Sequence, residues 1–229
     1  MPRDPSNPNG LRFETAEGVD HVVFTVPILS EQVLSSLAST LRSIAARAAP
    51  RPMVLRSDHP TVFLAGADLR EIAVLDSASC VDYADLGRSV VTALESHPAP
   101  TVSATAGSCS GGGFDIALAC DAIVAGPRAS FDHPGVRRGL VTGWTGTVSA
   151  PEAIGPTAAR VILLEGRRLD SEAALSIGLV GRICADPVRG AVEKALELAR
   201  LEPSRLRYWR HLRGSRFVDR FRAFVVHKL

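Results

Sequence analysis

Two glycine-containing turns are the segments of this chain best suited to chemistry. They are Ala65-Gly66-Ala67-Asp68 and Gly111-Gly112-Gly113, and each follows an apolar strand and opens a helix. The first N–H groups of a helix lack intrahelical partners and lie at the positive end of the helix dipole. Glycine lets the backbone approach a ligand closely. Both turns therefore predict sites for an anion, or for an oxygen that gains negative charge during a reaction.

Other interpretations of these turns stay open at this point. Either turn alone can be an ordinary strand-to-helix connection. The segment 107–111, which reads Gly-Ser-Cys-Ser-Gly, also has the strand–turn–helix setting of a nucleophile elbow, with Cys109 as the nucleophile of a hydrolase. Two turns of the same kind, about 45 residues apart, favour a shared site more than either turn does alone.

Strands and helices alternate along the chain around these turns. The expected strands cover 21–26, 52–57, 101–107 and 122–126, with a strand, a glycine and a helical start over 61–75. The expected helices cover 30–48, 80–96, 114–121, 151–166, 171–177 and 187–200, with Ser30 and either Asp170 or Ser171 opening two of them. Such alternation predicts an α/β fold built from parallel β-α units.

Length and composition limit the class of protein. With 229 residues, 46% of them hydrophobic, the chain suits one domain, alone or with a helical extension. This composition excludes a disordered protein, a collagen-like fibre and a disulfide-dense scaffold. We expect no membrane segment and no secretory signal, because no apolar run reaches about 18 residues and the first ten residues are polar. Four separate cysteines without a CxxC pair argue against a metal site and for a reducing cytoplasm.

The net charge of +2 hides an uneven distribution. Residues 201–229 carry eight basic and two acidic side chains, a net charge of +6, and include apolar residues at helical spacing. Such a tail suits nucleic acid, a membrane surface, a small polyanion such as a phosphorylated cofactor, or plain solvation of a helix face. With two tryptophans, two tyrosines and no recognition motif, the sequence predicts neither a nucleic-acid nor a membrane partner.

Three segments in order along the chain resemble the crotonase, or enoyl-CoA hydratase/isomerase, superfamily. They are FLAGADLREI at 63–72, AGSCSGGGFDIALACDAIVAGPRASF at 106–131 and GRRLDSEAALSIGLVGRI at 166–183. The resemblance implies a β-β-α spiral core, which we place over 1–185, followed by a short arginine-rich helical extension over 186–229. It also implies a homotrimer or a dimer of trimers.

The resemblance further implies an acyl-CoA substrate, with coenzyme A as part of the thioester and no separately bound cofactor or metal. Its thioester oxygen would lie between the backbone N–H groups of Ala67 and Gly112. The other residues implied in substrate or CoA binding are Ala65, Gly66, Asp68, Arg70, Gly111 and Gly135. Arginines bind phosphates well, so we expect Arg70 or arginines of the tail to contact the CoA phosphates.

The acid/base residues depart from the family pattern. Hydratases of the family carry two glutamates; Asp115 stands at the first position and Gly135 at the second. Asp115 is therefore the first candidate, with Asp132 and His133 as helpers, since histidine exchanges protons near neutral pH. Arg137 and Arg138 follow closely, and guanidinium groups can hold a substrate carboxylate.

Two functional hypotheses follow from this pattern. The first is an enoyl-CoA hydratase or dehydratase, a lyase that works through an oxyanion-stabilised enolate. The second is a catalytically weak or non-hydratase relative: an isomerase, a decarboxylase, a C–C bond lyase or an auxiliary partner subunit. The glycine at position 135 motivates the second hypothesis.

Overall fold

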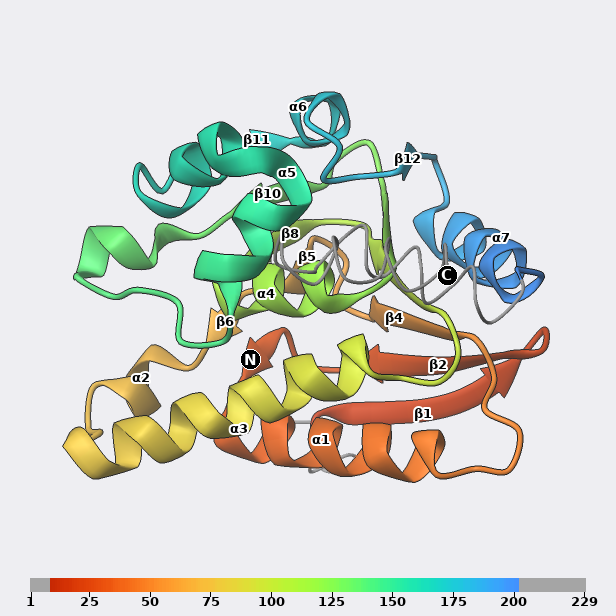
Figure 1. The fold of residues 1–229 in the computed structure, drawn as a ribbon, viewed down its shortest axis with the longest axis horizontal. Coiled ribbons are helices and arrows are strands. Elements are labelled where there is room, and N and C mark those ends of the chain that lie inside the picture. Colours follow the sequence, from red (N-terminus) through yellow and green to blue (C-terminus); the bar gives the residue numbers. More distant parts are fainter. Residues whose placement is uncertain (1–8, 202–229) are drawn as a thin grey trace, which may run out of the picture.

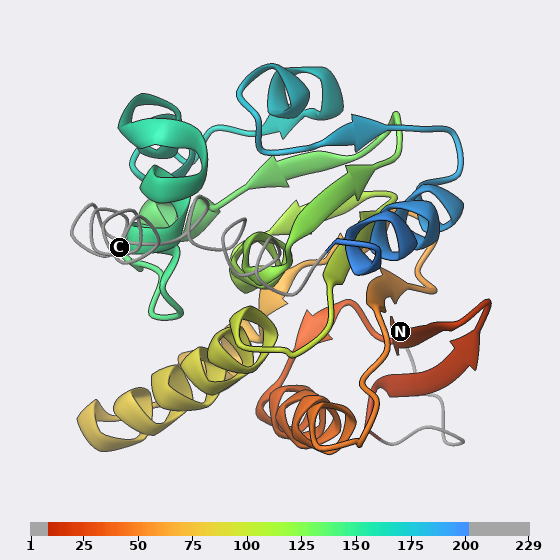
Figure 2. The same ribbon diagram turned by 45° about the vertical axis from the view of Figure 1, so that its right-hand side comes forward.

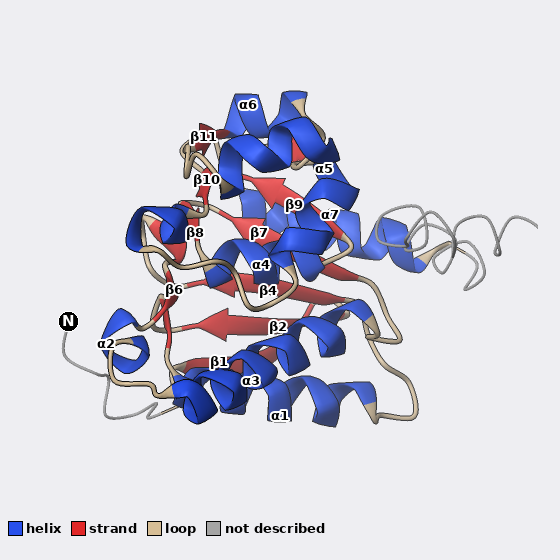
Figure 3. Ribbon diagram, turned by 60° about the vertical axis from the view of Figure 1, so that its left-hand side comes forward, coloured by secondary structure: helices blue, strands red, loops and turns tan. Residues whose placement is uncertain are grey.

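A computed structural model describes residues 9–201. Its largest sheet has six strands in the order β1-β2-β4-β7-β9-β12 (Figures 1 and 3). The strands are β1 (Leu11–Ala16), β2 (Val19–Phe24), β4 (Met53–Ser57), β7 (Thr101–Thr105), β9 (Ala122–Ala125) and β12 (Arg182–Ile183). Only the β1–β2 pair of this sheet is antiparallel. The parallel β-α units predicted from the sequence are therefore confirmed.

Shorter strands form two smaller sheets. A four-stranded sheet has the order β11-β10-β8-β5, and β3 pairs with β6. These strands are β3 (Ile28–Leu29), β5 (Val62–Leu64), β6 (Gly66–Ala67), β8 (Ser108–Ser110), β10 (Ser130–Asp132) and β11 (Leu169–Asp170). In chain order β4, β7 and β9 of the large sheet are each followed by a strand of the small one. This repeated β-β-α path is the spiral core that the family resemblance implied.

Helices cover the sheets, and most of them begin within three residues of the predicted start. They are α1 (Glu31–Ala45), α2 (Leu69–Ile72), α3 (Ser77–Glu95), α4 (Gly112–Ala119), α5 (Gly146–Leu163), α6 (Ser171–Ser176) and α7 (Pro187–Ala199), with a 3₁₀ helix, η1 (Pro134–Arg138). Ser30 and Asp170 cap α1 and α6 by accepting hydrogen bonds from backbone N–H groups. Helices α1 and α3 lie side by side (Figures 2 and 3).

Several parts of the fold differ from the sequence-based expectation. The short strands β3, β8, β10, β11 and β12 were not predicted, and two larger differences involve β1 and α5. Strand β1, which was not predicted, forms a hairpin with β2 through Glu17 and Gly18, both at positive φ. Helix α5 begins at Gly146, earlier than expected, and is broken at Gly155 (φ 79°), directly before Pro156. A proline inside a helix removes a hydrogen bond and clashes with the preceding turn, which accounts for the break.

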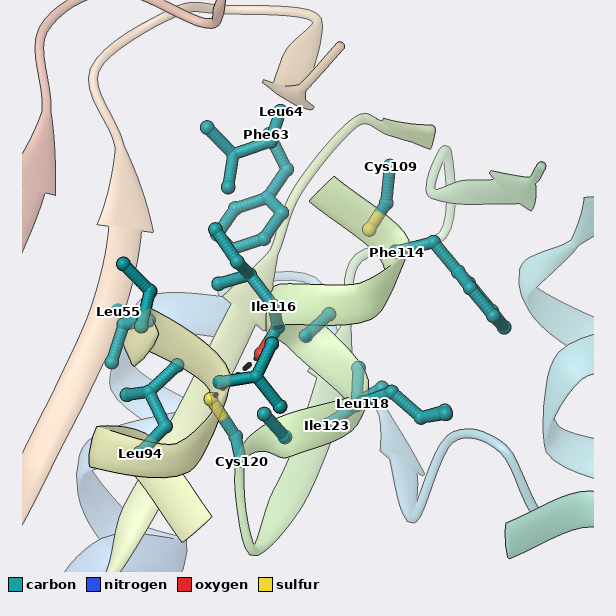
Figure 4. Close-up of a cluster of buried hydrophobic side chains, with 14 of the residues drawn as sticks. Leu55, Phe63, Leu64, Leu94, Cys109, Phe114, Ile116, Leu118, Cys120 and Ile123 are labelled. Carbon is teal, nitrogen blue, oxygen red and sulfur yellow. Dashed lines mark hydrogen bonds between the residues drawn. The ribbon is translucent and has the colours of Figure 1, made fainter. Parts of the chain in front are cut away.

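Successive residues of the central strands point into two separate hydrophobic clusters. Met53 and Leu55 of β4 belong to the larger cluster, and Val54 between them belongs to the smaller one. This follows from the alternation of side chains along a strand. Figure 4 shows part of the larger cluster, in which Ile116 of α4 lies among side chains from β4, β5 and α3. Helix α4 is buried over almost its whole length, so its N-terminus is held rigidly.

The smaller cluster joins α7 to the six-stranded sheet. Ala191, Ala195 and Leu198 pack against apolar side chains of β4, β7 and β9. The part of the expected extension that the structure describes therefore packs on the sheet. Residues 202–229, including the arginine tail and its predicted contacts with CoA phosphates, lie outside the described residues. No helix within residues 9–201 is both long and apolar enough to cross a membrane.

Candidate active site

The two glycine turns lie directly against each other. A Cβ built on Gly66 would lie 2.9 Å from the carbonyl oxygen of Ser110 and 3.0 Å from the amide nitrogen of Gly112. Only glycine permits this approach, and the φ of +91° at Gly66 also favours glycine. Strand β6 holds Ala67 by pairing with β3, and Gly112 is the first residue of α4. The structure thus brings the two predicted oxyanion residues onto neighbouring pieces of backbone.

Both turns line a cavity of about 500 Å³. Nine of the residues expected at the site line it: Ala65, Gly66, Ala67, Asp68, Gly111, Gly112, Asp115, His133 and Gly135. The remaining walls come from α2, α3 and the segment 138–144. Because these residues come from five separate regions of the chain, the cavity exists only in the folded protein.

Asp115 lies in the first turn of α4, only 3% exposed. Its Oδ2 accepts a hydrogen bond from Oγ1 of Thr142 over 2.6 Å. Its Oδ1 is buried and has no hydrogen-bond partner among the described residues. Gly146 makes room for this oxygen, because any Cβ at that position would overlap Oδ1. A buried carboxylate oxygen without a protein partner can accept a hydrogen bond or a proton from a bound substrate.

His133 is the second titratable group on the same wall. Its Nε2 lies 3.7 Å from Oδ2 of Asp115, and the residue is 7% exposed. A Cβ built on Gly135 would lie 3.4 Å from both Nδ1 and Cε1 of His133. The imidazole therefore packs beside the position at which the family resemblance places its second glutamate.

Trp144 holds this arrangement together, and sequence reasoning did not assign it to the site. A Cβ on Gly87 of α3 or on Gly112 of α4 would overlap its indole ring. The ring therefore fills the gap between two helices and packs directly on a predicted oxyanion residue. Its backbone N–H donates to Oγ1 of Thr142 over 3.3 Å. The Gly143-Trp144 pair after a glycine-rich loop was the available signal, whereas nothing in the sequence indicated Thr142.

Two other predicted site residues have different surroundings. Asp132 accepts a hydrogen bond from Nε of Arg168 over 2.9 Å and lies outside the lining of the cavity that the described residues form. Arg70 donates two hydrogen bonds to the carboxylate of Asp68 and is likewise outside that lining. The geometry therefore brings His133, rather than Asp132, to Asp115.

Cys109 does not have the setting of a nucleophile. The residue is fully buried on β8 within the larger hydrophobic cluster (Figure 4). Burial, with smaller contributions from Asp132 and Asp115, raises the pKa of its thiol well above the ordinary value. Since the thiolate is the nucleophile, this geometry disfavours the hydrolase interpretation. Within residues 9–201, no group of three or more His, Cys, Asp or Glu side chains could hold a metal ion.

Comparison with known proteins decides the family. Residues 14–208 match the family described as "Enoyl-CoA hydratase/isomerase". The chain belongs to the enoyl-CoA hydratase/isomerase family. It is 33% identical over 174 residues to the mitochondrial methylglutaconyl-CoA hydratase of Mus musculus, covering 75% of this chain and 55% of that relative. It is 32% identical over 189 residues to the human mitochondrial enoyl-CoA hydratase domain-containing protein 2, covering 80% and 65%.

Solved structures of similar proteins share the fold. The structure of Pseudomonas aeruginosa DspI matches with a TM-score of 0.82 at 26% identity, covering 91% of this chain and 87% of that chain. An enoyl-CoA hydratase from Bacillus anthracis matches with a TM-score of 0.78 at 27% identity, covering 88% and 81%. The chain spans little more than half the length of the methylglutaconyl-CoA hydratases that it matches. Membership of the enoyl-CoA hydratase/isomerase family is therefore established for the matched core.

Proposed function

We propose that this protein is a lyase that adds water to an enoyl-CoA thioester, or removes it from the hydrated product. The observation that carries the proposal is the pairing of Asp115 with His133, 3.7 Å apart, in a cavity that two abutting glycine turns also line. Relatives named as hydratases support the same reaction class. The expected trimeric assembly and cytoplasmic location stay predictions.

The glycine turns would stabilise the reacting thioester. In this proposal the N–H groups of Ala67 and Gly112 donate to the thioester oxygen. Charge develops on that oxygen as the enolate forms, and fixed donors stabilise it without reorganising. Removing one such donor costs about 3–4 kcal/mol of barrier in other enzymes. The tight contact between Gly66 and the start of α4 supports this role, since it keeps the backbone that carries one N–H donor close to the backbone that carries the other.

Asp115 and His133 would carry the protons. Hydration adds the oxygen of water to the β-carbon and a proton to the α-carbon, so a proton must leave the water and another must reach the enolate. Two adjacent groups that each exchange protons can perform both transfers. The imidazole of His133 takes the place of the second family glutamate, beside Gly135. Thr142 fixes one carboxylate oxygen of Asp115 by a hydrogen bond, and the other oxygen has no partner among the described residues.

A second candidate is a non-hydratase or catalytically weak member of the family. Gly135 favours it, because no carboxylate is available at that position. Isomerisation, decarboxylation and C–C bond cleavage use the same stabilised enolate with different proton partners. An auxiliary subunit would retain acyl-CoA binding without turnover.

Hydration of crotonyl-CoA, followed by the loss of enoyl absorbance, tests the proposal. We expect turnover by the wild type and a decrease in kcat of about 10²- to 10⁴-fold for Asp115→Asn. Asp82→Asn is the matched control, since Asp82 is exposed and lies outside the cavity lining formed by the described residues. Binding of acyl-CoA without turnover would favour the second candidate. Absence of both from folded protein would refute the two together.

A further inference from the structure

Arg138 is a cation on the wall of the candidate active site. It lines the cavity at the end of η1, and the described residues give it no hydrogen bond or ion pair. Its neighbour Arg137 differs, since Nη2 of that residue donates to the carbonyl oxygen of Gly166 over 3.0 Å. Arg138 is thus the one arginine among residues 9–201 that faces this cavity.

The acids of the same cavity have hydrogen-bond donors other than Arg138. Asp68 accepts two hydrogen bonds from Arg70, and Asp115 accepts one from Thr142. Most of the remaining lining is apolar or small, including Leu69, Ile72 and Leu140. Arg138 is exposed beside this surface, so its guanidinium is available to an anionic group on a ligand that fills the cavity.

Arg138 lies close along the chain to the candidate acid/base residue His133. It follows His133 by five residues, and five residues of 3₁₀ helix rise by about 10 Å. Gly139, at a φ of 69°, then turns the chain so that the segment 140–144 returns to the cavity. A long arginine side chain can therefore reach a group a few carbons from the reacting atoms. The CoA phosphates are separated from those atoms by the long pantetheine arm.

We propose that Arg138 binds a carboxylate on the acyl portion of the substrate, so that the preferred substrate is the CoA thioester of a dicarboxylic acid. The inference rests on the proposed function for its acyl-CoA substrate. The planar guanidinium matches a carboxylate through two parallel hydrogen bonds. A site built to bind such a group discriminates strongly against analogues that lack it, because its own polar group is then left unpaired.

Binding of unreactive saturated thioesters tests this inference without requiring turnover. Glutaryl-CoA carries the terminal carboxylate, and its analogue with an isopropyl group in that place has a similar shape without charge. Calorimetry should show that Arg138→Met weakens the binding of glutaryl-CoA by about 10- to 100-fold and leaves the analogue within about twofold. Arg138→Lys should retain part of the preference. Arg128→Met, which removes an exposed arginine outside the cavity lining formed by the described residues, should change neither affinity.

The other possible outcomes distinguish a carboxylate of the acyl group from a CoA phosphate as the group that Arg138 binds. Equal weakening of both thioesters and of free CoA would assign Arg138 to a CoA phosphate and overturn the carboxylate proposal. Unchanged binding of both would overturn it as well. If the preference for glutaryl-CoA is found but glutaconyl-CoA is not hydrated, the inference about Arg138 stands and the proposed hydratase activity fails.

Discussion

The hydroxyl of Thr142 donates a hydrogen bond over 2.6 Å to Oδ2 of Asp115, which comes from a helix that starts 30 residues earlier in the chain. The same hydroxyl oxygen accepts the backbone N–H of Trp144 over 3.3 Å, which orients its proton toward the carboxylate. The contact links α4 to the segment 138–144, which also lines the cavity. We infer that Thr142 is a positioning residue for Asp115.

Replacing Thr142 with valine tests this role, because valine keeps the shape and removes the hydroxyl. Without the donor, Asp115 is free to rotate and its buried charge loses a partner, so we expect kcat for crotonyl-CoA hydration to fall about 10- to 100-fold. KM should change little, because valine keeps the shape of the cavity lining at this position. Thr142→Ser, which retains the hydroxyl, should stay within a fewfold of the wild type; equal losses in both variants would contradict the positioning role.

Gly112→Ala should destabilise the fold as well as the site. Its Cβ would overlap the indole of Trp144, and overpacking of this kind costs about 1–3 kcal/mol. Urea denaturation measures the loss. Gly181→Ala is the matched control, because its Cβ would meet only the carbonyl oxygen of Ile123, 3.8 Å away. Adding Trp144→Ala to Gly112→Ala should cost less than the sum of the two single changes; strict additivity would exclude the direct clash.

His133→Gln should lower kcat by about 10²- to 10³-fold if the imidazole exchanges protons with substrate. The alternative is a structural role, in which His133 only fills the turn before Pro134. In that case kcat should fall only slightly. Gly135→Glu on the His133→Gln background restores the carboxylate that the family resemblance places there. We expect this double variant to recover part of the lost kcat, whereas Gly135→Gln on the same background should recover none.

His21, 5% exposed on β2, should make stability fall at mildly acidic pH. Burial first, and then the positive charge of Arg56, lowers the pKa of His21 below its usual value of 6.5. Near pH 6.5 the imidazole therefore becomes protonated in the unfolded chain while it stays neutral in the folded chain. Because protonation favours the unfolded chain, the free energy of unfolding decreases as the pH falls below that value. Unfolding at pH 8 and pH 5 should show a smaller difference for His21→Gln than for the wild type. An unchanged difference would mean that His21 titrates alike in both states.

The Cys109→Ala variant distinguishes a packing role of Cys109 in the hydrophobic core from a catalytic role. The buried thiol leaves a small cavity on truncation, so we expect a loss of stability of about 1 kcal/mol or more. Turnover should be unchanged, because Cys109 lies in the hydrophobic cluster, outside the cavity lining formed by the described residues. Loss of turnover in stable protein would revive the nucleophile interpretation.

Local sequence determined most of the secondary structure and the backbone part of the site. Ser30 and Asp170 open helices because their side chains satisfy free N–H groups within a few residues, an interaction that needs no distant partner. The two glycine turns were likewise visible as strand–glycine–helix patterns. The break in α5 at Gly155 was missed, although Pro156 beside it was the signal for it.

Only the tertiary structure decided which side chains meet. Asp132 and His133 are neighbours in sequence and were equivalent as candidate helpers, but successive residues at a strand end point to opposite sides. The structure accordingly pairs Asp132 with Arg168 and turns His133 toward Asp115. Thr142 contacts Asp115, and Trp144 packs on Gly112, only because the loop that carries both residues folds back against α4. Contacts of this kind are decided by the packing of distant elements, which no local pattern records.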